Sequence, residues 1–167
     1  MGQTLTNISL EDNKTIKEGV AVINNNTLNG IIIFIQKDFY VEIIIDIKGL
    51  KRNSLHGFHI HEAGDLREGC NSCCKHYNPT NKTHGDLNDV NSHAGDLGNI
   101  MSDLYGNSKG IIRTTKITLN EIIGRSIIIH ENRDDLGKGS NADSLITGNS
   151  GARIGCAIIG ISKNNCK

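Results

Sequence analysis

The chain has 167 residues, with 18 basic and 18 acidic side chains, so its formal net charge is zero. This length predicts one domain with its own core. The balanced charge, without any Lys/Arg run, argues against nucleic-acid binding, which needs a basic surface. No apolar run reaches the roughly 18 residues of a membrane span, and no secretory signal pattern is present, so we expect a cytoplasmic protein.

The first residues, MGQTLT, fit the pattern for N-myristoylation of Gly2. The alternative is an unmodified extension that frays. A single acyl chain without a basic patch binds membranes weakly and reversibly, so at most weak membrane association is expected. Ile and Asn are abundant, as A/T-rich codons produce, which is typical of parasites, protists and large DNA viruses. If the gene is viral, the location is the host cytoplasm or the virion.

Apolar residues alternate with polar ones between positions 39 and 48, and only Ile44 breaks the pattern. The predicted core-facing residues of this strand are Phe39, Val41, Ile43, Ile45 and Ile47. Further β-branched runs predict strands at 20–23, 30–36, 55–61, 111–119, 126–130 and 156–161. Because no segment keeps helical periodicity, these strands favour an antiparallel sandwich or barrel over an α/β fold.

Two segments, 62–92 and 132–153, do not have the pattern of strands. Loops of this length inside a compact domain are usually functional or disordered. The first contains three Cys, two His and the only Pro, and the second contains an acidic pair and several Gly. We therefore expect the functional site between these two segments.

His59 and His61 are two residues apart in a predicted strand, so their rings leave the same face and can bind one Cu or Zn ion. An incidental pair is the alternative. His56 has the opposite parity and is interpreted as a packed histidine hydrogen-bonded to the backbone. A further group can complete a closed, structural zinc site, with solvated loop histidines as the alternative. Its members are His76, His84, His93 and Asp96.

Six motifs, in this order and at this spacing, resemble the copper,zinc superoxide dismutases. They are LHGFHIHEAGD (55–65), HYNP (76–79), HAGDLGN (93–99), IIGRSIIIHE (122–131), DDLGKG (134–139) and TGNSGARIGCAIIGI (147–161). The resemblance covers 18–162 as one domain, with 1–17 as a flexible N-terminal extension and 163–167 as a C-terminal tail. It implies an eight-stranded antiparallel Greek-key β-barrel or sandwich, immunoglobulin-like, with two long functional loops.

The resemblance also implies the metal ligands and the activity. The implied copper ligands are His59, His61, His76 and His130, and the implied zinc ligands are His76, His84, His93 and Asp96. Asp134 would join His59 to His84 as an outer carboxylate. Arg153 would attract superoxide, and His76 would return a proton. The implied reaction is disproportionation of superoxide to O₂ and H₂O₂ by Cu(II)/Cu(I) cycling, with zinc structural, in antioxidant defence.

The resemblance implies a disulfide between Cys70 and Cys156. Cys73, Cys74 and Cys166 depart from the family pattern, and with five cysteines at least one is free. For Cys73 and Cys74 three interpretations remain open: inert packing, a competing thiol site for copper, or exchange partners of the disulfide.

The second long segment departs from the family as well. Where many relatives have acidic residues and a lysine, this chain has Ala142, Asp143, Leu145 and Ile146. We therefore expect weaker electrostatic attraction of substrate and a shallower salt dependence.

Residues 122–124 and 159–161 resemble the family's dimer surface, so a homodimer is expected. A copper chaperone is a candidate partner. The alternative functions are a non-enzymatic copper carrier and a decoy homologue that binds a copper chaperone. The complete ligand set and Arg153 argue against both.

Overall fold

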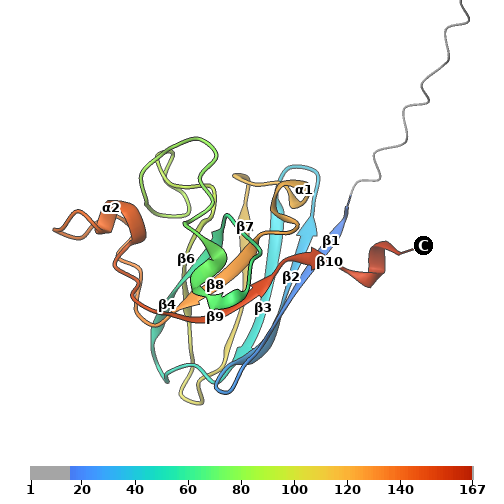
Figure 1. Cartoon of the computed structure of the whole chain (residues 1–167), viewed down its shortest axis with the longest axis horizontal. Coiled ribbons are helices and arrows are strands. Elements are labelled where there is room, and N and C mark those ends of the chain that lie inside the picture. Colours follow the sequence, from blue (N-terminus) through green and yellow to red (C-terminus); the bar gives the residue numbers. More distant parts are fainter. Residues whose placement is uncertain (1–15, 167) are drawn as a thin grey trace, which may run out of the picture.

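The structure is a computed structural model that describes residues 16–166, so the predicted acylation site Gly2 lies outside the described residues. Two antiparallel sheets pack face to face (Figure 1), which confirms the all-β sandwich. The first sheet contains β10 (Gly160–Ile161), β1 (Glu18–Asn24), β2 (Asn29–Gln36), β3 (Val41–Lys48) and β7 (Ser108–Thr114), in this order. The second contains β6 (Asp96–Met101), β4 (Leu55–His61), β8 (Ser126–His130) and β9 (Arg153–Ile158). Within residues 16–166 no strand pair joins the two sheets, so the barrel is not closed.

The chain passes repeatedly from one sheet to the other. β1, β2 and β3 follow one another in the first sheet, but β3 then pairs with β7, and β4 pairs with β6 and β8 in the second sheet. This exchange of neighbours is the Greek-key arrangement expected from the resemblance. It places β4 in the interior of its sheet.

β-Branched side chains fill the space between the sheets. Val41, Ile43, Ile45 and Ile47 of β3 are buried, as their alternation predicts. Phe39 does not continue this face. It is 87% exposed in a turn that the amide of Lys37 closes by donating to the carbonyl of Tyr40 at 2.9 Å, so β3 begins only at Val41.

The predicted strand at 111–119 is wrong in its second half, because β7 ends at Thr114 and helix α1 (Leu119–Ile122) follows. Thr118 and Glu121 form a capping box in which the amide of Thr118 donates to Glu121 Oε2 at 2.7 Å. This reciprocal capping starts a helix despite the β-branched composition. The predicted strand at 156–161 divides into β9 and β10, which lie in different sheets.

Two strands were not predicted. β6 contains Asp96, an expected zinc ligand, together with Gly98 and Asn99, so its alternation of apolar residues is weak. β5 (Arg67–Cys70) lies within the segment expected to contain no strand. It has no pairing with either sheet among the described residues.

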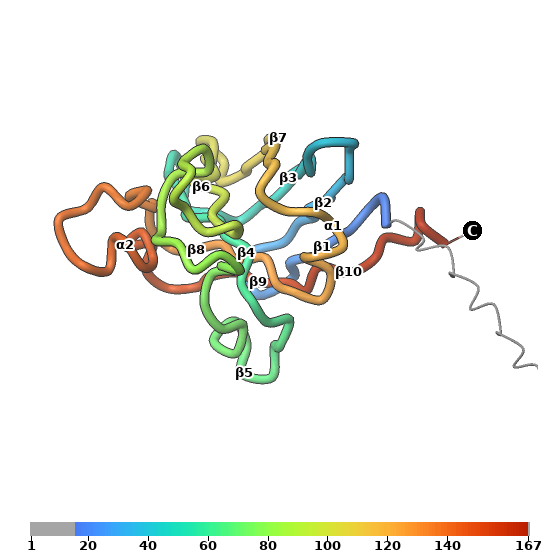
Figure 2. Tube along the Cα trace, turned by 90° about the horizontal axis from the view of Figure 1, so that it is seen from above, coloured from blue at the N-terminus to red at the C-terminus, as the bar shows by residue number. Residues whose placement is uncertain are grey.

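The two long segments leave the sandwich on different sides, as Figure 2 shows. The first contains β5 and the short helix η1 (Asn71–Cys73), and the second contains α2 (Ser144–Thr147). Near the C-terminal end of the chain, η2 (Lys163–Asn165) follows β10. None of the helices in the described part of the chain is long and apolar enough to cross a membrane.

Candidate metal centre

β4 supplies the first site residues because both of its faces are buried. Phe58 and Ile60 point into the core between the sheets. His59 and His61 have the opposite parity and lie on the outer face, yet both are buried. The long segments cover this face, and His76 of the first segment forms an isolated bridge with His61. The period of a strand therefore places two imidazoles together beneath a cover.

Four histidines form the first cluster, and their potential ligand atoms all lie within 4.8 Å of one another: His59, His61, His76 and His130. His59 Nε2 bonds Asp134 Oδ2 at 2.6 Å, and the Nδ1 atoms of His61 and His130 contact the carbonyls of Cys74 and Gly151 at 3.0 and 3.1 Å. Carbonyl and carboxylate oxygens only accept, so these ring nitrogens carry the hydrogens. The remaining atoms, His59 Nδ1, His61 Nε2 and His130 Nε2, have no hydrogen-bond partner among residues 16–166.

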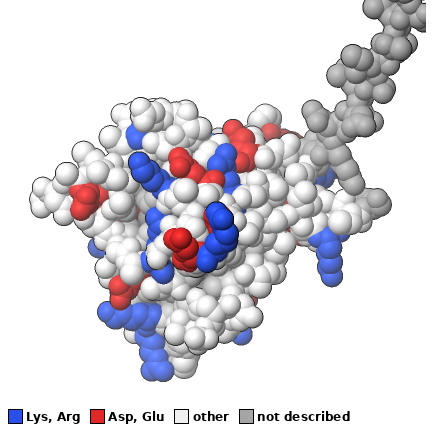
Figure 3. Space-filling view, viewed as in Figure 1, with Lys and Arg blue, Asp and Glu red and all other residues white. Residues whose placement is uncertain are grey.

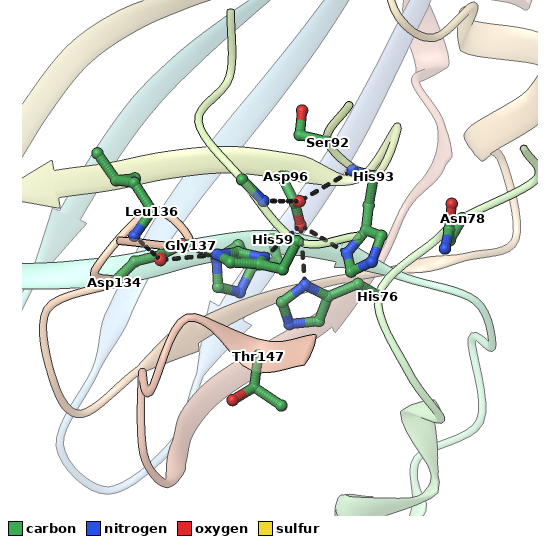
Figure 4. Close-up of polar contacts among 12 residues, drawn as sticks. His59, His76, Asn78, Ser92, His93, Asp96, Asp134, Leu136, Gly137 and Thr147 are labelled. Carbon is green, nitrogen blue, oxygen red and sulfur yellow. Dashed lines mark hydrogen bonds and ion pairs between the residues drawn. The ribbon is translucent and has the colours of Figure 1, made fainter. Parts of the chain in front are cut away.

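The second cluster surrounds the carboxylate of Asp96 (Figure 4). Asp96 Oδ1 lies 2.8 Å from His76 Nδ1, 3.0 Å from His84 Nδ1 and 3.1 Å from His93 Nδ1. Its Oδ2 accepts from the amides of Gly85 and His93 at 3.1 and 3.0 Å. Three imidazole nitrogens and one carboxylate oxygen are the donor set of a tetrahedral zinc site.

His59 also lies near the second cluster, since its ring falls within the 4.8 Å grouping with His76, His84 and Asp96. Its Nε2 is bonded to Asp134, so Nδ1 is the atom that it can offer to either cluster. If that nitrogen serves the first cluster, His93, whose Nδ1 lies 3.1 Å from Asp96 Oδ1, is available as the fourth donor of the second. The two clusters then share His76, through its two ring nitrogens.

Asp134 connects the two clusters from behind. Its Oδ2 contacts His59 Nε2 at 2.6 Å, and its Oδ1 contacts His84 Nε2 at 2.8 Å. Gly148, at φ +66°, packs against both Asp134 and His84 so closely that a Cβ atom would collide with them. A side chain at this position would therefore displace the carboxylate that orients both rings.

Arg153 lies directly across from His130 in the β8–β9 pair. Its guanidinium donates to the carbonyls of Cys70 at 2.8 Å and Cys74 at 2.6 Å. A guanidinium has five donors, so these contacts fix its position and leave donors for an anion. Arg153, His61, His76 and His130 all line one cleft of about 840 Å³.

Burial controls the protonation of the first cluster. Burial and the neighbouring His76 lower the pKa of His59 to about 3, and burial lowers that of His130 to about 4. Burial also opposes a charge on His84, but the hydrogen bond to Asp134 and the nearby carboxylate of Asp96 outweigh it and raise the pKa of His84 to about 9. The first cluster is thus neutral and ready to bind a cation at neutral pH, whereas His84 must release a proton first.

These shifts predict how the metal-free protein responds to acid. Between about pH 6.5 and pH 4 the unfolded chain binds protons at positions 59 and 130 that the folded chain rejects, so stability falls as the pH is lowered. The raised pKa of His84 acts oppositely: its contribution is complete below about pH 6.5 and is lost towards pH 9. Calorimetry of the metal-free protein should give a lower melting temperature at pH 4.5 than at pH 7. An unchanged melting temperature would contradict this expectation.

The disulfide between Cys70 and Cys156 is present, which confirms the pairing implied by the resemblance. Cys73 is buried and unbridged, with its thiol 3.4 Å from the carbonyl of Asp65. Cys74 and Cys166 are exposed and unbridged. The burial of Cys73 favours the packing interpretation for that residue.

Two contributions to the site were not predicted. Asn99 holds the backbone of Asp134 through its Oδ1 at 2.8 Å and its Nδ2 at 2.9 Å. The carbonyl of Cys74 anchors both His61 and Arg153. Asn99 lies inside a motif that carries the resemblance and could have been singled out there. A backbone carbonyl leaves no signal in the sequence.

A β-sandwich that gathers six histidines and one aspartate into two adjoining clusters defines a binuclear metal protein. Residues 28–159 match the family model for copper/zinc superoxide dismutase. The copper–zinc superoxide dismutase of Paramecium bursaria Chlorella virus 1 is 44% identical over 165 residues, covering 97% of this chain and 88% of the viral protein. The chain therefore belongs to the copper/zinc superoxide dismutase family.

Two further comparisons agree. Copper–zinc superoxide dismutase 5 of Dictyostelium discoideum is 50% identical over 151 residues, which cover 86% of this chain and 97% of that protein. The crystal structure of the clock protein EA4 has a TM-score of 0.86 and 40% sequence identity, and the match covers 97% of this chain and 100% of that chain.

Proposed function

We propose that this protein disproportionates superoxide to O₂ and H₂O₂ in antioxidant defence. The observation that carries the proposal is the set of three unpartnered ring nitrogens, on His59, His61 and His130, gathered with His76 beside a cleft that also contains Arg153. Buried polar atoms without partners are costly, so their convergence indicates a site that binds a cation. The cleft gives a small anion access to it.

The donor sets fit two different ions. His59, His61, His76 and His130 would hold copper, since imidazole suits that metal. His76, His84, His93 and Asp96 would hold zinc, which has no redox chemistry and a preference for four tetrahedral ligands. Bound copper would supply the one-electron chemistry, oxidising one superoxide to O₂ and reducing a second to peroxide. Asp134 supports the proposal because it orients one ring of each set.

The remaining steps belong to the chain's own residues. Arg153 would attract superoxide electrostatically and orient it with the donors that its carbonyl contacts leave over. His76 lines the cleft while its Nδ1 faces Asp96. The His76 ring would carry one proton to the reduced substrate, and solvent entering the cleft would supply the second.

The test is a measurement of superoxide dismutation by purified protein, with copper and zinc quantified in the same sample. We expect rapid turnover at about one copper and one zinc per chain, with a kcat/KM that approaches the diffusion limit. Protein loaded with zinc alone should be inactive. Full loading of both metals without activity would reject the dismutase and favour a copper carrier or a decoy homologue.

The charges around the cleft predict the salt dependence. Lys75, Lys82 and Arg153 line it together with the acidic Glu62 and Asp143. Leu145 and Ile146 of α2 are exposed and apolar, so this part of the cleft does not attract an anion. The attraction of superoxide therefore depends mainly on Lys75, Lys82 and Arg153. Figure 3 shows acidic and basic side chains interspersed on the face that it presents. Such a weak field favours the shallow salt dependence expected above.

Reversing a charge at this cleft should therefore change the rate. Lys75 directly precedes His76, and Lys75→Glu is expected to lower kcat/KM by roughly 3- to 10-fold at low ionic strength, with the difference shrinking in about 1 M salt. Glu62→Gln should raise it. Pulse radiolysis at several ionic strengths measures both effects. Equal rates for the wild type and Lys75→Glu at low salt would contradict the expected role of this lysine.

The homodimer remains part of the proposal, with a corrected surface. Ile122 and Ile159 are fully buried in the core of the same chain, so they cannot contribute to an interface. Ile158 and Ile161 are 43% and 52% exposed and support isologous pairing. Sedimentation equilibrium should give twice the chain mass of 18.1 kDa, and a mass of 18.1 kDa at micromolar concentration would refute the dimer.

We further propose a cytoplasmic location, with a copper chaperone as a candidate partner.

A further inference from the structure

The segment 86–92 joins two of the proposed zinc ligands, His84 and His93, without contributing a ligand itself. It consists of turns, and no residue in it belongs to a strand or helix. Its internal contacts are local: the amide of Asp89 donates to the carbonyl of Asp86 at 3.0 Å, and the amide of Ser92 donates to the carbonyl of Asp89 at 3.3 Å. Local turns alone do not fix where the segment lies against the sandwich.

Lys116 reaches this segment from the connection between β7 and α1. Its Nζ donates to the carbonyl of Asp89 at 2.6 Å and to the carbonyl of Asp86 at 3.4 Å. It also donates to the hydroxyl of Ser92, which is 2% exposed. An ammonium group has three donors and no acceptor, so these three oxygens satisfy it completely.

The contacted residues lie close to the proposed zinc ligands. Asp86 follows His84 by two residues, and Ser92 directly precedes His93, beside which Figure 4 places it. The two ends of the segment are already tied to Asp96, whose Oδ2 accepts from the amides of Gly85 and His93. Between these ends Leu87 packs against the core, and Lys116 adds a polar attachment that three carbonyl and hydroxyl oxygens of the segment share.

The electrostatic setting agrees with this role. Lys116 is half-buried, and burial lowers the pKa of its ammonium group, whereas Asp96, Asp89 and Asp86 act in the opposite direction. Lys82 also approaches the segment, but it is exposed, and within the described part of the chain its Nζ donates to one acceptor, the carbonyl of Val90, at 2.7 Å. A half-buried cation with three oxygen partners in one loop holds that loop more firmly than an exposed cation with one.

We propose that Lys116 is a positioning residue for the zinc cluster. Its ammonium group fixes the segment 86–92 so that the Nδ1 atoms of His84 and His93 already face Asp96 before zinc binds. The inference rests on the proposed function, since it takes His84, His93 and Asp96 as zinc ligands. It predicts that the side chain at position 116 controls zinc affinity without touching the ion.

The test is zinc affinity, measured by competition with a chromogenic chelator on the full chain. Lys116→Met keeps the length of the side chain and removes its donors, and we expect a loss of about 10- to 100-fold in zinc affinity, the usual effect of removing an outer contact. The control is Lys109→Met on the other sheet, because Lys109 is exposed and, among the residues that the structure describes, pairs with Asp46 alone, at 3.2 Å. It should bind zinc like the wild type. Cobalt(II) absorption in place of zinc should broaden in Lys116→Met alone.

A second, milder variant tests the same contact in case Lys116→Met does not fold. Ser92→Ala removes one of the three acceptors and should also lower zinc affinity, by a smaller factor. In both variants the copper affinity of the first cluster should stay within about threefold of the wild type, because the effect is expected to be confined to the zinc ligands. Zinc affinities of Lys116→Met and Ser92→Ala within twofold of the wild type would overturn the inference while the dismutase stands. A wild type that binds no zinc would overturn the proposed function and this inference together.

Discussion

Replacing His130 with alanine is expected to abolish superoxide dismutation and to remove copper from the protein, while zinc remains bound. His130 contributes one of the unpartnered nitrogens of the first cluster and is not a member of the second. Loss of an outer partner of a metal ligand already costs about 10- to 100-fold in affinity, so loss of the ligand itself should cost more than about 100-fold. Metal analysis after dialysis and a dismutation assay measure the two effects.

The matched control is His56→Asn. His56 is also a buried histidine, and its Nδ1 contacts the carbonyl of His130 at 2.9 Å, as expected of a packed histidine hydrogen-bonded to the backbone. Asparagine retains a donor for that carbonyl, so this variant should keep copper and activity even if it is less stable. Wild-type activity in His130→Ala at full copper occupancy would show that position 130 is no ligand.

The sequence predicts the fold best where one face of a strand meets only the core. In β3, the alternation of Val41, Ile43, Ile45 and Ile47 identifies the buried face correctly, because period two is a direct consequence of strand geometry. β6 escapes prediction because Asp96 and its neighbours Gly98 and Asn99 serve the site and interrupt the apolar pattern. Functional residues weaken the pattern by which a strand is recognised.

Short-range chemistry can also override composition. The residues from Thr118 to Glu121 have a capping-box sequence, yet the β-branched run before them favours a strand. The helix forms because the capping contacts are local, whereas a strand at this point would need a partner. The burial of Ile159 involves a distant part of the chain instead: its amide donates to the carbonyl of Arg125 at 2.8 Å, and its side chain is fully buried.

For the metal centre, spacing identifies residues but not atoms. The pair His59 and His61 follows from strand parity alone. Which nitrogen of each ring is free depends on acceptors such as Asp134 and the carbonyl of Cys74, which are 75 and 13 residues away in the chain. Only the folded chain shows that these acceptors leave the free nitrogens pointing towards one another.

The second large effect is expected from removing the disulfide. Cys70 and Cys156 are 86 residues apart, and a bridge that closes a loop of about this length constrains the unfolded chain by roughly 4–5 kcal/mol in the entropic description. The double variant Cys70→Ser/Cys156→Ser should lose about this free energy of unfolding. Urea denaturation of the metal-free protein measures it without a contribution from metal binding.

Activity should fall as well, because the backbone at Cys70 also positions Arg153. Its guanidinium donates to the carbonyl of Cys70, so releasing Cys70 from β9 loosens the group expected to orient superoxide. The double variant, fully loaded with metals, should therefore show a lower kcat/KM. Cys166→Ser, at an exposed and unbridged cysteine, should match the wild type in both measurements. If the free energy of unfolding of the double variant lies within about 1 kcal/mol of the wild-type value, the unfolded chain is already restricted without the bridge. The entropic description would then fail for this loop.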